Sequence, residues 1–313
     1  MEPQEGNIMD TVKLPIKLVV IIGTNASGKS SLAVDLAELF AGEVISADSR
    51  QIYRGLDIGA GKITPSEMRN IPHHLINVAE LDSTFSLADY QRLAYATIDN
   101  ICDRGLRPFL VGGTGLYVRS ITQGYNLIDV PPDQALRDQL EQRSSHELWA
   151  QLESADPAAA GIIDPRNKRR LIRALELCGA GRKYSEQHAS SPRYSALQLG
   201  LTWPPDTLRE RIHTRLLRRI KEGMIEETEN LLRSGVSRER LDSLGLEYRH
   251  LVRYIDGTYK TEKEFIEKLA VHIYRFSRKQ IIWFRRDTDI KWLNPQGDYR
   301  AEAVELINDH LRS

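Results

Sequence analysis

Residues 23–30 are the first group in this chain whose types and spacing point to a chemistry. They fit the phosphate-loop pattern G-x-x-x-x-G-K-[ST], in which backbone N–H groups and the positive end of the following helix surround an anion. The lysine of such a loop adds a full charge, and the hydroxyl after it contacts Mg²⁺. We therefore predict a phosphate site at Gly23, Thr24, Asn25, Ala26, Ser27, Gly28, Lys29 and Ser30, with Ser30 as the metal contact.

Asp48 and Thr114 are the next candidates. Most phosphate loops hold ATP or GTP, and such enzymes usually carry an apolar strand that ends in an aspartate near the metal. Here the corresponding run, PFLVGG, ends in glycine and is followed by Thr114. The nearest acid is Asp48, at the end of the run EVISA, where it faces the loop and is free to act as a base. The alternatives are that Asp48 caps a helix beginning near Ser49 and that Thr114 only closes the glycine-rich turn.

The segments around these residues alternate between strands and helices. Short apolar runs predict strands at 17–22, 43–47, 107–113 and 195–203. Apolar residues at helical spacing predict a helix over 30–40, and Ser86 with Asp89 indicates the capped start of a helix that runs to about Asp103. This alternation predicts an α/β fold with a parallel, doubly wound sheet, whose ligands gather at the carboxyl ends of the strands.

The pattern changes to helices alone after Pro131-Pro132. Helical spacing covers about 133–153 and 166–179, and further amphipathic helices follow near 205–234 and 262–286. We therefore expect three parts, which are a disordered N-terminus (1–13), an α/β core with C-terminal helices (14–130 and 191–313) and an inserted helical domain (131–190).

Composition excludes several classes of protein. Forty-three basic residues balance forty-three acidic ones, so any affinity for nucleic acid has to come from local clusters. Two cysteines are too few for a disulfide framework or a four-ligand zinc site. The first thirteen residues are unlike a signal peptide, and no apolar run approaches the ~18 residues of a membrane span. We expect a soluble cytoplasmic protein with no membrane partner.

Eight blocks of the chain resemble, in order, those of the tRNA dimethylallyltransferases (tRNA isopentenyltransferases) of bacterial type. They are GTNASGKSSLA, ISADSRQIYRGLDIGAGK, PHHLINV, FSLADYQRLA, PFLVGGTGLYVRS, NKRRLIRALEL, ERIHTRLLRRI and RFSRKQIIWFRR, spread from about residue 18 to 293. DSRQIY together with GGTGLY is far more specific than the phosphate loop alone. The chain departs from the family pattern at Thr24-Asn25, where Pro-Thr is common, in GAGK at 59–62, where GTAK is usual, and in LGLEYRHL, where a shorter block is more frequent.

The resemblance implies a phosphate-loop NTPase-like fold and a prenyl transfer. The family moves a five-carbon allyl group from dimethylallyl diphosphate to N6 of the adenosine just 3′ of the anticodon, forming N6-isopentenyladenosine. The loop's anion is then a diphosphate leaving group, and Arg215 adds a guanidinium fork to it. The N6 lone pair of adenine is delocalised into the ring, so attack needs a base, for which Asp48 is placed. Thr114, by the same resemblance, hydrogen-bonds the edge of the adenine or the backbone of its nucleotide. Without the resemblance, an arginine at the position of Arg215 is more often a solvated charge on a helix.

The expected partners are the anticodon stem-loop of tRNA, dimethylallyl diphosphate and Mg²⁺. We expect the protein to be a monomer. The segments 166–173 and 275–286 carry ten basic residues and no acid, although two solvated helix faces would show the same pattern. The predicted tRNA contacts are Asp48, Ser49, Arg50, Gln51, Thr114, Arg137, Lys168, Arg169, Arg170, Leu171, Ile172, Arg275, Arg278 and Lys279.

Two other functions fit parts of the sequence. An adenylate isopentenyltransferase shares the core but acts on free nucleotide, and the long helical insertion argues against it. A nucleotide-switched RNA-binding protein would carry the same loop and basic segments without turning over an allylic diphosphate.

Overall fold

The computed structural model describes residues 16–128, 130–188 and 191–313, so the segment 1–13 predicted to be disordered lies outside the described residues. In this part of the chain one parallel sheet has the strand order β3-β2-β4-β1-β5-β6. Its strands are β1 (Ile16–Gly23), β2 (Gly42–Ala47), β3 (His73–His74), β4 (Arg107–Gly112), β5 (Tyr194–Leu201) and β6 (Ile290–Trp292). The all-parallel sheet with helices on both faces confirms the predicted doubly wound α/β class.

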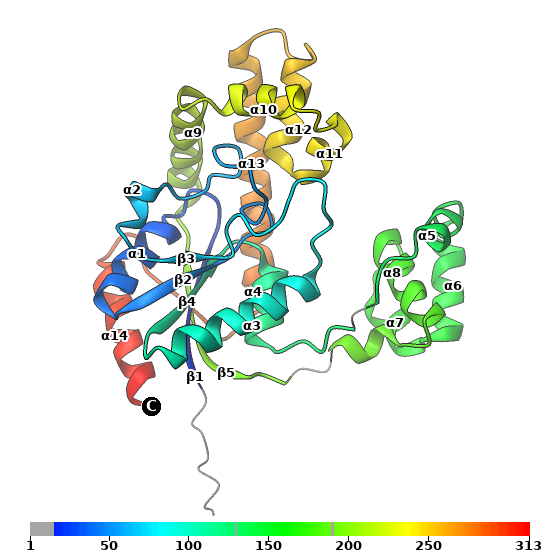
Figure 1. Ribbon diagram of the computed structural model, residues 1–313, viewed down its shortest axis with the longest axis horizontal. Coiled ribbons are helices and arrows are strands. Elements are labelled where there is room, and N and C mark those ends of the chain that lie inside the picture. Colours follow the sequence, from blue (N-terminus) through cyan, green and yellow to red (C-terminus); the bar gives the residue numbers. More distant parts are fainter. Residues whose placement is uncertain (1–15, 129, 189–190) are drawn as a thin grey trace, which may run out of the picture.

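The two faces of the sheet carry separate cores, because neighbouring residues of a strand point to opposite sides. Leu18, Val20 and Ile22 of β1 belong to one core, and Val19 and Ile21 belong to the other. Helices α3 (Leu87–Asp103) and α4 (Gly115–Thr122) cover the first face, whereas α1 (Lys29–Leu39) and α14 (Tyr299–Arg312) cover the second (Figure 1). β1 is buried on both faces, which explains its continuous β-branched run.

The phosphate loop follows β1 at the place where the strand order reverses. From β1 the chain passes to β2 on one side of the sheet and later returns to β5 on the other. In open α/β sheets this switch point opens a crevice at the carboxyl ends of the strands. The fold therefore positions residues 24–28 at the rim where a ligand is expected.

The predicted start of α3 is confirmed by its capping contacts. Ser86 Oγ accepts a hydrogen bond from the Asp89 backbone N at 3.0 Å, and Asp89 Oδ2 accepts one from the Ser86 backbone N at 3.1 Å. This reciprocal pair satisfies two N–H groups that would otherwise lack a partner at the helix end.

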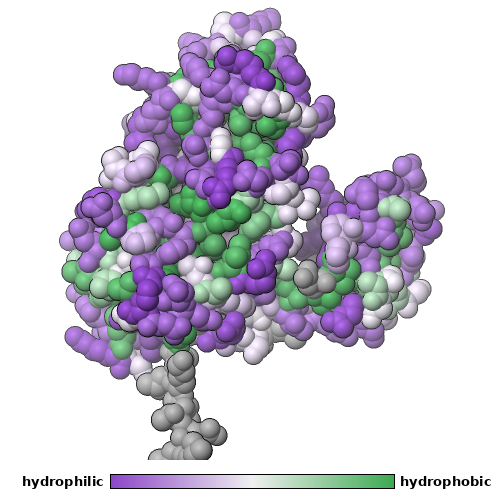
Figure 2. Space-filling view, in the orientation of Figure 1, coloured by the Kyte–Doolittle hydropathy of each residue, from purple (hydrophilic) through white to green (hydrophobic). Residues whose placement is uncertain are grey.

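Residues 134–188, called the helical unit below, pack around an apolar core of their own. The unit contains α5 (Gln134–Glu141), α6 (Ser145–Ala155), α7 (Pro157–Ile162), α8 (Lys168–Gly179) and the 3₁₀ turn η1 (Tyr184–His188). Leu148, Leu152 and Leu171 are among its fully buried residues, and the unit stands apart from the sheet in Figures 1 and 2. The prediction of one helix over 133–153 was wrong, because Ser144 starts a new helix with a capping box.

A layer of helices lies beyond the carboxyl ends of the strands (Figure 1). It consists of α9 (Pro205–Lys221), α10 (Met224–Arg233), α11 (Arg238–Leu244), α12 (Leu246–Ile255) and α13 (Glu262–Phe284). The predicted helix over 205–234 is broken at Gly223, whose φ of 100° is accessible to glycine and strained for other residues. Figure 2 shows hydrophobic side chains in the middle of this face of the molecule, below the largely hydrophilic surface of the layer.

Among the described residues, no helix combines the length and the apolar character that crossing a membrane requires.

Candidate active site

The phosphate loop has the backbone of an anion cradle. Gly28 precedes α1 with φ 97°, and Ala26 is also left-handed with φ 60°. Two loop carbonyls are held from outside, since Ala26 O accepts from Arg211 Nε and Ser27 O accepts from Trp203 Nε1, both at 2.8 Å. The Arg211 guanidinium lies 4.5 Å from the centre of the Trp203 ring, so the two donors also support each other.

A cavity of about 500 Å³ opens beside this loop. Residues 25–30 form one wall, and Asp48 and Gln51 lie at the turn after β2. Ala60 and Gly61 form a second wall. The face of α9 completes the cavity with Glu210, Arg211, Thr214, Arg215 and Arg218. Asp48, Arg215 and Lys29, which the sequence assigned separately, therefore share one space.

Burial and mutual repulsion destabilise the charged forms of the basic residues in the cavity. Burial lowers the pKa of Lys29 to about 8, an effect that Asp48 opposes and Arg215 increases. Burial also lowers the pKa of Arg215 to about 10, and Arg219 lowers it further. A bound anion would relieve both desolvation and repulsion, because a nearby negative charge favours the protonated form. The electrostatics thus match an anionic ligand.

Asp48 lies in a turn and does not cap a helix. Its Oδ1 accepts a hydrogen bond from the backbone N of Arg50 at 2.9 Å, and no helix starts at Ser49. Thr114 Oγ1 accepts a hydrogen bond from the backbone N of Ser49 at 3.0 Å. The Thr114 hydroxyl thus ties the end of β4 to the turn that carries Asp48, and it does not itself line the cavity. The alternative that Asp48 caps a helix is therefore wrong, whereas the contacts of Thr114 are those of a residue that holds a turn.

The predicted tRNA contacts fall into different environments. Arg169 and Arg170 at the start of α8 are exposed, and their side chains make no ion pair within the described part of the chain. Lys168 in contrast bonds to Glu141. Arg137 Nε lies 2.6 Å from the carboxylate of Glu176, which is almost fully buried. Arg137 therefore neutralises a buried acid, because an unpaired one would be costly.

Leu171 and Ile172 were wrongly predicted as surface contacts. Both are buried in the core of the helical unit, with 0% and 4% of their surface exposed. Helical spacing places them on the apolar face of α8, opposite Arg169 and Arg170.

A second exposed basic group lies on α13, outside the helical unit. Arg275, Arg278 and Lys279 are exposed, and across residues 16–128, 130–188 and 191–313 none of them has an acidic partner. Arg278 makes only a long hydrogen bond, 3.5 Å, to Tyr274 Oη. The two exposed groups thus differ from the enclosed cations of the cavity.

Sequence reasoning missed Arg211 and Arg218 in the cavity wall. They flank Arg215 at spacings of four and three residues, so all three share one face of α9. This spacing was visible in ERIHTRLLRR once the helix was predicted.

The oxygen atoms near the loop suit a hard divalent cation. Ser30 and Asp48 both line the cavity, and Mg²⁺ is usually bound through one or two protein oxygens together with substrate phosphates. The described residues contain no group of three or more His, Cys, Asp or Glu that could bind a metal without such a substrate.

The chain is similar to proteins of one enzyme family. The family model described as IPP transferase matches residues 51–287. The chain is 42% identical over 295 residues to tRNA dimethylallyltransferase 2 of Citrifermentans bemidjiense, covering 93% of this chain and 94% of that protein. It is 37% identical over 309 residues to the tRNA dimethylallyltransferase of Bacillus subtilis, covering 96% and 97%.

Solved structures agree with these matches. The tRNA isopentenylpyrophosphate transferase of Bacillus halodurans superimposes with a TM-score of 0.71 at 38% identity, covering 95% of this chain and 97% of that one. A eukaryotic dimethylallyltransferase that acts on tRNA has a TM-score of 0.81 at 24% identity, covering 95% and 80%, which supports the shared fold.

Proposed function

The chain belongs to the tRNA dimethylallyltransferase family and prenylates adenosine in tRNA, and we propose that it takes the dimethylallyl group from dimethylallyl diphosphate and delivers it to N6 of the adenosine just 3′ of the anticodon. The resemblance inferred from the eight sequence blocks is thereby confirmed at the level of the family. The finer assignments of donor, atom and residues form the proposal.

The observation that supports it best is the shared cavity. An anion-binding loop, a buried arginine and a free carboxylate line the same space of about 500 Å³. A diphosphate on the loop would bring its allylic carbon near Asp48, because Asp48 and Gln51 line the same cavity as residues 25–30. A leaving-group site and a base site are thus adjacent, as a displacement at that carbon requires.

The reaction is a substitution at the allylic C1 carbon. The N6 amine forms a bond to C1 while the bond between C1 and the diphosphate oxygen breaks, and Asp48 accepts the proton that N6 loses. Negative charge develops on the departing oxygen, where the loop N–H groups, Lys29 and Arg215 stabilise it. Removal of the proton as bonding proceeds compensates for the weak nucleophilicity of the delocalised N6 lone pair.

Mg²⁺ fits the same site as a partner of the diphosphate. When bound, it would add positive charge to the diphosphate oxygens, and the Ser30 hydroxyl would hold it. The role of Ser30 is therefore to orient the ion and donor on the loop.

The acceptor base has to leave its stack before N6 reaches Asp48. We assign the turn Asp48, Ser49, Arg50 and Gln51 to the flipped adenosine, with Thr114 fixing that turn through its hydroxyl. The hydrogen bond from Ser49 N to Thr114 Oγ1 at 3.0 Å supports this arrangement.

The exposed cations are assigned to the phosphates of the anticodon stem-loop. Arg169 and Arg170 bind the tRNA from the helical unit, which lies within the predicted inserted domain (131–190). Arg275, Arg278 and Lys279 add a second contact from α13. Their lack of acidic partners within the described residues supports this role. We propose that the protein works as a cytoplasmic monomer.

The test is transfer of label from the donor. The full chain is incubated with Mg²⁺, labelled dimethylallyl diphosphate and either an unmodified anticodon stem-loop, the same stem-loop with guanosine replacing the adenosine 3′ of the anticodon, or AMP. We expect label in the first acceptor and none in the other two. Efficient labelling of AMP, or of the guanosine stem-loop, would contradict the proposed acceptor.

A further inference from the structure

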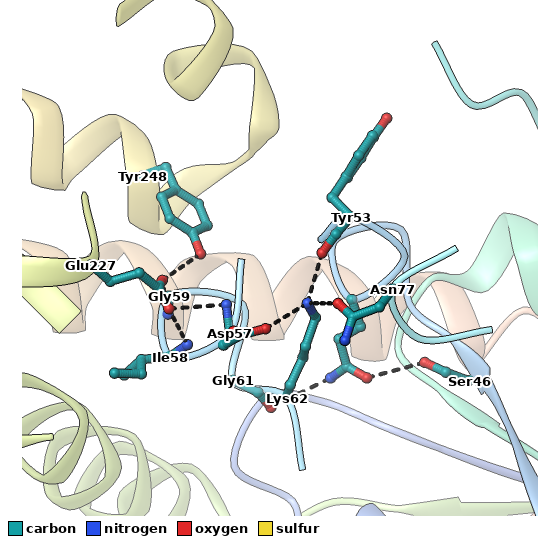
Figure 3. A network of polar contacts seen from close by, with 11 residues as sticks. Ser46, Tyr53, Asp57, Ile58, Gly59, Gly61, Lys62, Asn77, Glu227 and Tyr248 are labelled. Atoms are coloured by element: carbon teal, nitrogen blue, oxygen red, sulfur yellow. Dashed lines mark hydrogen bonds and ion pairs between the residues drawn. The ribbon is translucent and has the colours of Figure 1, made fainter. Parts of the chain in front are cut away.

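The loop of residues 57–62, called the wall loop below, lies next to Glu227 and Tyr248 of the C-terminal helices (Figure 3). Its residues Ala60 and Gly61 line the cavity directly. The surrounding side chains come from α9, α10 and α12, far from the wall loop in sequence. The contacts of this loop therefore connect α10 and α12, whose residues do not line the cavity, to the ligand site.

Glu227 of α10 holds the first half of the wall loop. Its Oε2 accepts hydrogen bonds from the backbone N of Asp57 at 3.0 Å and of Ile58 at 2.6 Å, and its Oε1 accepts from the backbone N of Gly59 at 2.9 Å. Tyr248 Oη donates to the same Oε1 at 2.9 Å. Three successive N–H groups that converge on one anion form a nest, which an ionised carboxylate fills well (Figure 3).

Two arginines of α9 bind the carbonyl groups of the same loop. Arg219 Nε donates to Ile58 O at 2.7 Å, and its terminal nitrogen donates to Gly59 O. Arg215 donates to Gly61 O at 3.1 Å, which is its one hydrogen bond within the part of the chain that the structure describes. Glu227 and these arginines thus satisfy the N–H groups and the carbonyl groups of the loop in turn.

The glycines of the wall loop make these close approaches possible. A Cβ atom on Gly59 would lie 2.4 Å from the Tyr248 ring. A Cβ atom on Gly61, whose φ is +61°, would lie 2.5 Å from the Arg215 guanidinium. The positions of Tyr248 and Arg215 therefore depend on the exact path of this backbone.

Lys62 fixes the other end of the loop. Its Nζ donates to Tyr53 O at 2.7 Å, to Asp57 Oδ1 at 2.8 Å and to Asn77 Oδ1 at 2.5 Å (Figure 3). With Lys62 at one end and Glu227 at the other, Gly61 O between them has a fixed place. Gln51 Nε2 also donates to that carbonyl, at 3.4 Å.

We propose that Glu227 is a positioning residue for the diphosphate site: by filling the nest of residues 57–59 it sets Gly61 O, which holds Arg215 inside the cavity. This inference rests on the proposed function, in which Arg215 binds the diphosphate. Arg215 needs such an anchor because Arg219, Arg218 and Lys29 repel it, whereas the acids that attract it, Glu247 and Asp48, form no ion pair with it.

The test is a double-mutant cycle on the full chain, with dimethylallyl diphosphate and Mg²⁺ as the probe and titration calorimetry as the readout. Glu227→Gln keeps the shape of the side chain but removes its negative charge. Its NH₂ group is a donor and cannot accept hydrogen bonds from the backbone N–H groups of the loop. We expect the donor Kd to rise about tenfold in Glu227→Gln, and Arg215→Ala to weaken binding at least as much. In the Arg215→Ala background, Glu227→Gln should then change the donor Kd less than twofold, because its effect passes through Arg215.

Two further variants make the result specific. Glu226→Gln alters the neighbouring, exposed acid of α10 and should leave donor affinity unchanged. Tyr248→Phe removes one of the four donors to Glu227 and should weaken donor binding a few-fold in the same direction, which keeps the test valid if Glu227→Gln fails to fold. Affinity for tRNA should stay within twofold in both Glu227→Gln and Tyr248→Phe, and the donor KM should rise more than kcat falls.

The outcomes separate the two claims. The positioning role is wrong if Glu227→Gln weakens donor binding equally in the parent and in Arg215→Ala. It is also wrong if Arg215→Ala weakens donor binding and Glu227→Gln does not. In both cases the diphosphate site stands. If Arg215→Ala leaves donor binding unchanged, the diphosphate assignment fails, and the role of Glu227 fails with it.

Discussion

The basic residues of the cavity and those of the exposed helix faces are the same chemical types in opposite settings. Three cations of the cavity each donate to a backbone carbonyl: Lys29 to Thr24 O at 3.4 Å, Arg211 to Ala26 O at 2.8 Å and Arg215 to Gly61 O at 3.1 Å. Arg169 and Lys279 make no side-chain hydrogen bond to any described residue.

This difference explains how a chain with no net charge is able to bind two anionic ligands, a diphosphate and a tRNA. An enclosed cation with a fixed partner has already lost its conformational entropy, so it is able to hold a small anion in a defined orientation. An exposed, unpaired cation is free to meet the phosphates of a large polyanion, and it contributes through counterion release. We therefore expect changes in the cavity to act on chemistry and donor binding, and changes on the helix faces to act on tRNA affinity.

The largest effect is expected from Asp48→Asn. Loss of the base should lower the single-turnover rate by roughly 10² or more, the usual range for general-base catalysis, and leave tRNA affinity within a few-fold. Asparagine still accepts the hydrogen bond from Arg50 N, so the turn should persist. Asp82→Asn, an exposed acid on the loop before α3, is the matched control and should react normally. A near-normal rate in Asp48→Asn would remove Asp48 from the mechanism.

Lys29→Ala should have the next largest effect. The variant loses a charged hydrogen-bond donor to the diphosphate, and donor affinity should fall about 10- to 100-fold, as is typical for such bonds. Inorganic diphosphate, used as a competitor of the donor, measures the same loss without chemistry. Donor binding that is equally strong without Lys29 would mean that the loop serves another ligand.

The double variant in which Arg169 and Arg170 are both replaced by alanine tests the role of the exposed cations. The slope of log affinity for tRNA against log salt concentration should fall by up to about 2, since each phosphate contact contributes nearly one unit. Arg92 and Lys263 are exposed cations that pair with acids, so their double alanine variant is the control. An unchanged slope in the Arg169 and Arg170 variant would show that these residues are solvated helix charges.

The smallest effect is a pH dependence of donor binding. The free protein has a Lys29 pKa of about 8, so its charged form decreases above that pH and donor affinity should fall about fourfold between pH 7 and 8.5. Bound diphosphate raises the pKa of Lys29, so the lysine stays charged in the complex over this range. The fall in donor affinity therefore follows the pKa of the free protein. Lys29→Arg keeps its charge over the range and should bind the donor independently of pH. Equal pH profiles for the two proteins would contradict the charged role of Lys29.

Local patterns predicted the parts of the fold that local forces determine. The strand before residue 23, the loop and the capped start of α3 each follow from a few neighbouring residues, and the structure agrees with all three. The break at Gly223 was missed because the apolar spacing of α9 and α10 runs on through it. The two-residue strand β3 is too short for any periodicity, and only its pairing with β2 defines it.

The site shows the same division. Asp48 and Arg215 were predicted, the former from its place at a strand end and the latter from the family block. Glu227 was not, because its partners at 57–59 lie 168 to 170 residues away in sequence and are backbone groups without a side-chain signature. The pairing of Arg137 was not predicted for a related reason, since only the fold shows that the acid opposite it, Glu176, is buried.

One salt titration tests the comparison most directly. Affinity for inorganic diphosphate and for an unmodified anticodon stem-loop is measured on the parent protein over the same range of salt concentrations. If about five exposed cations meet phosphates, the log–log slope for the stem-loop should be about −4, and the slope for diphosphate should be less than half as steep because enclosed charges are screened less. Two equally steep slopes would contradict the division into an enclosed diphosphate site and an exposed tRNA surface.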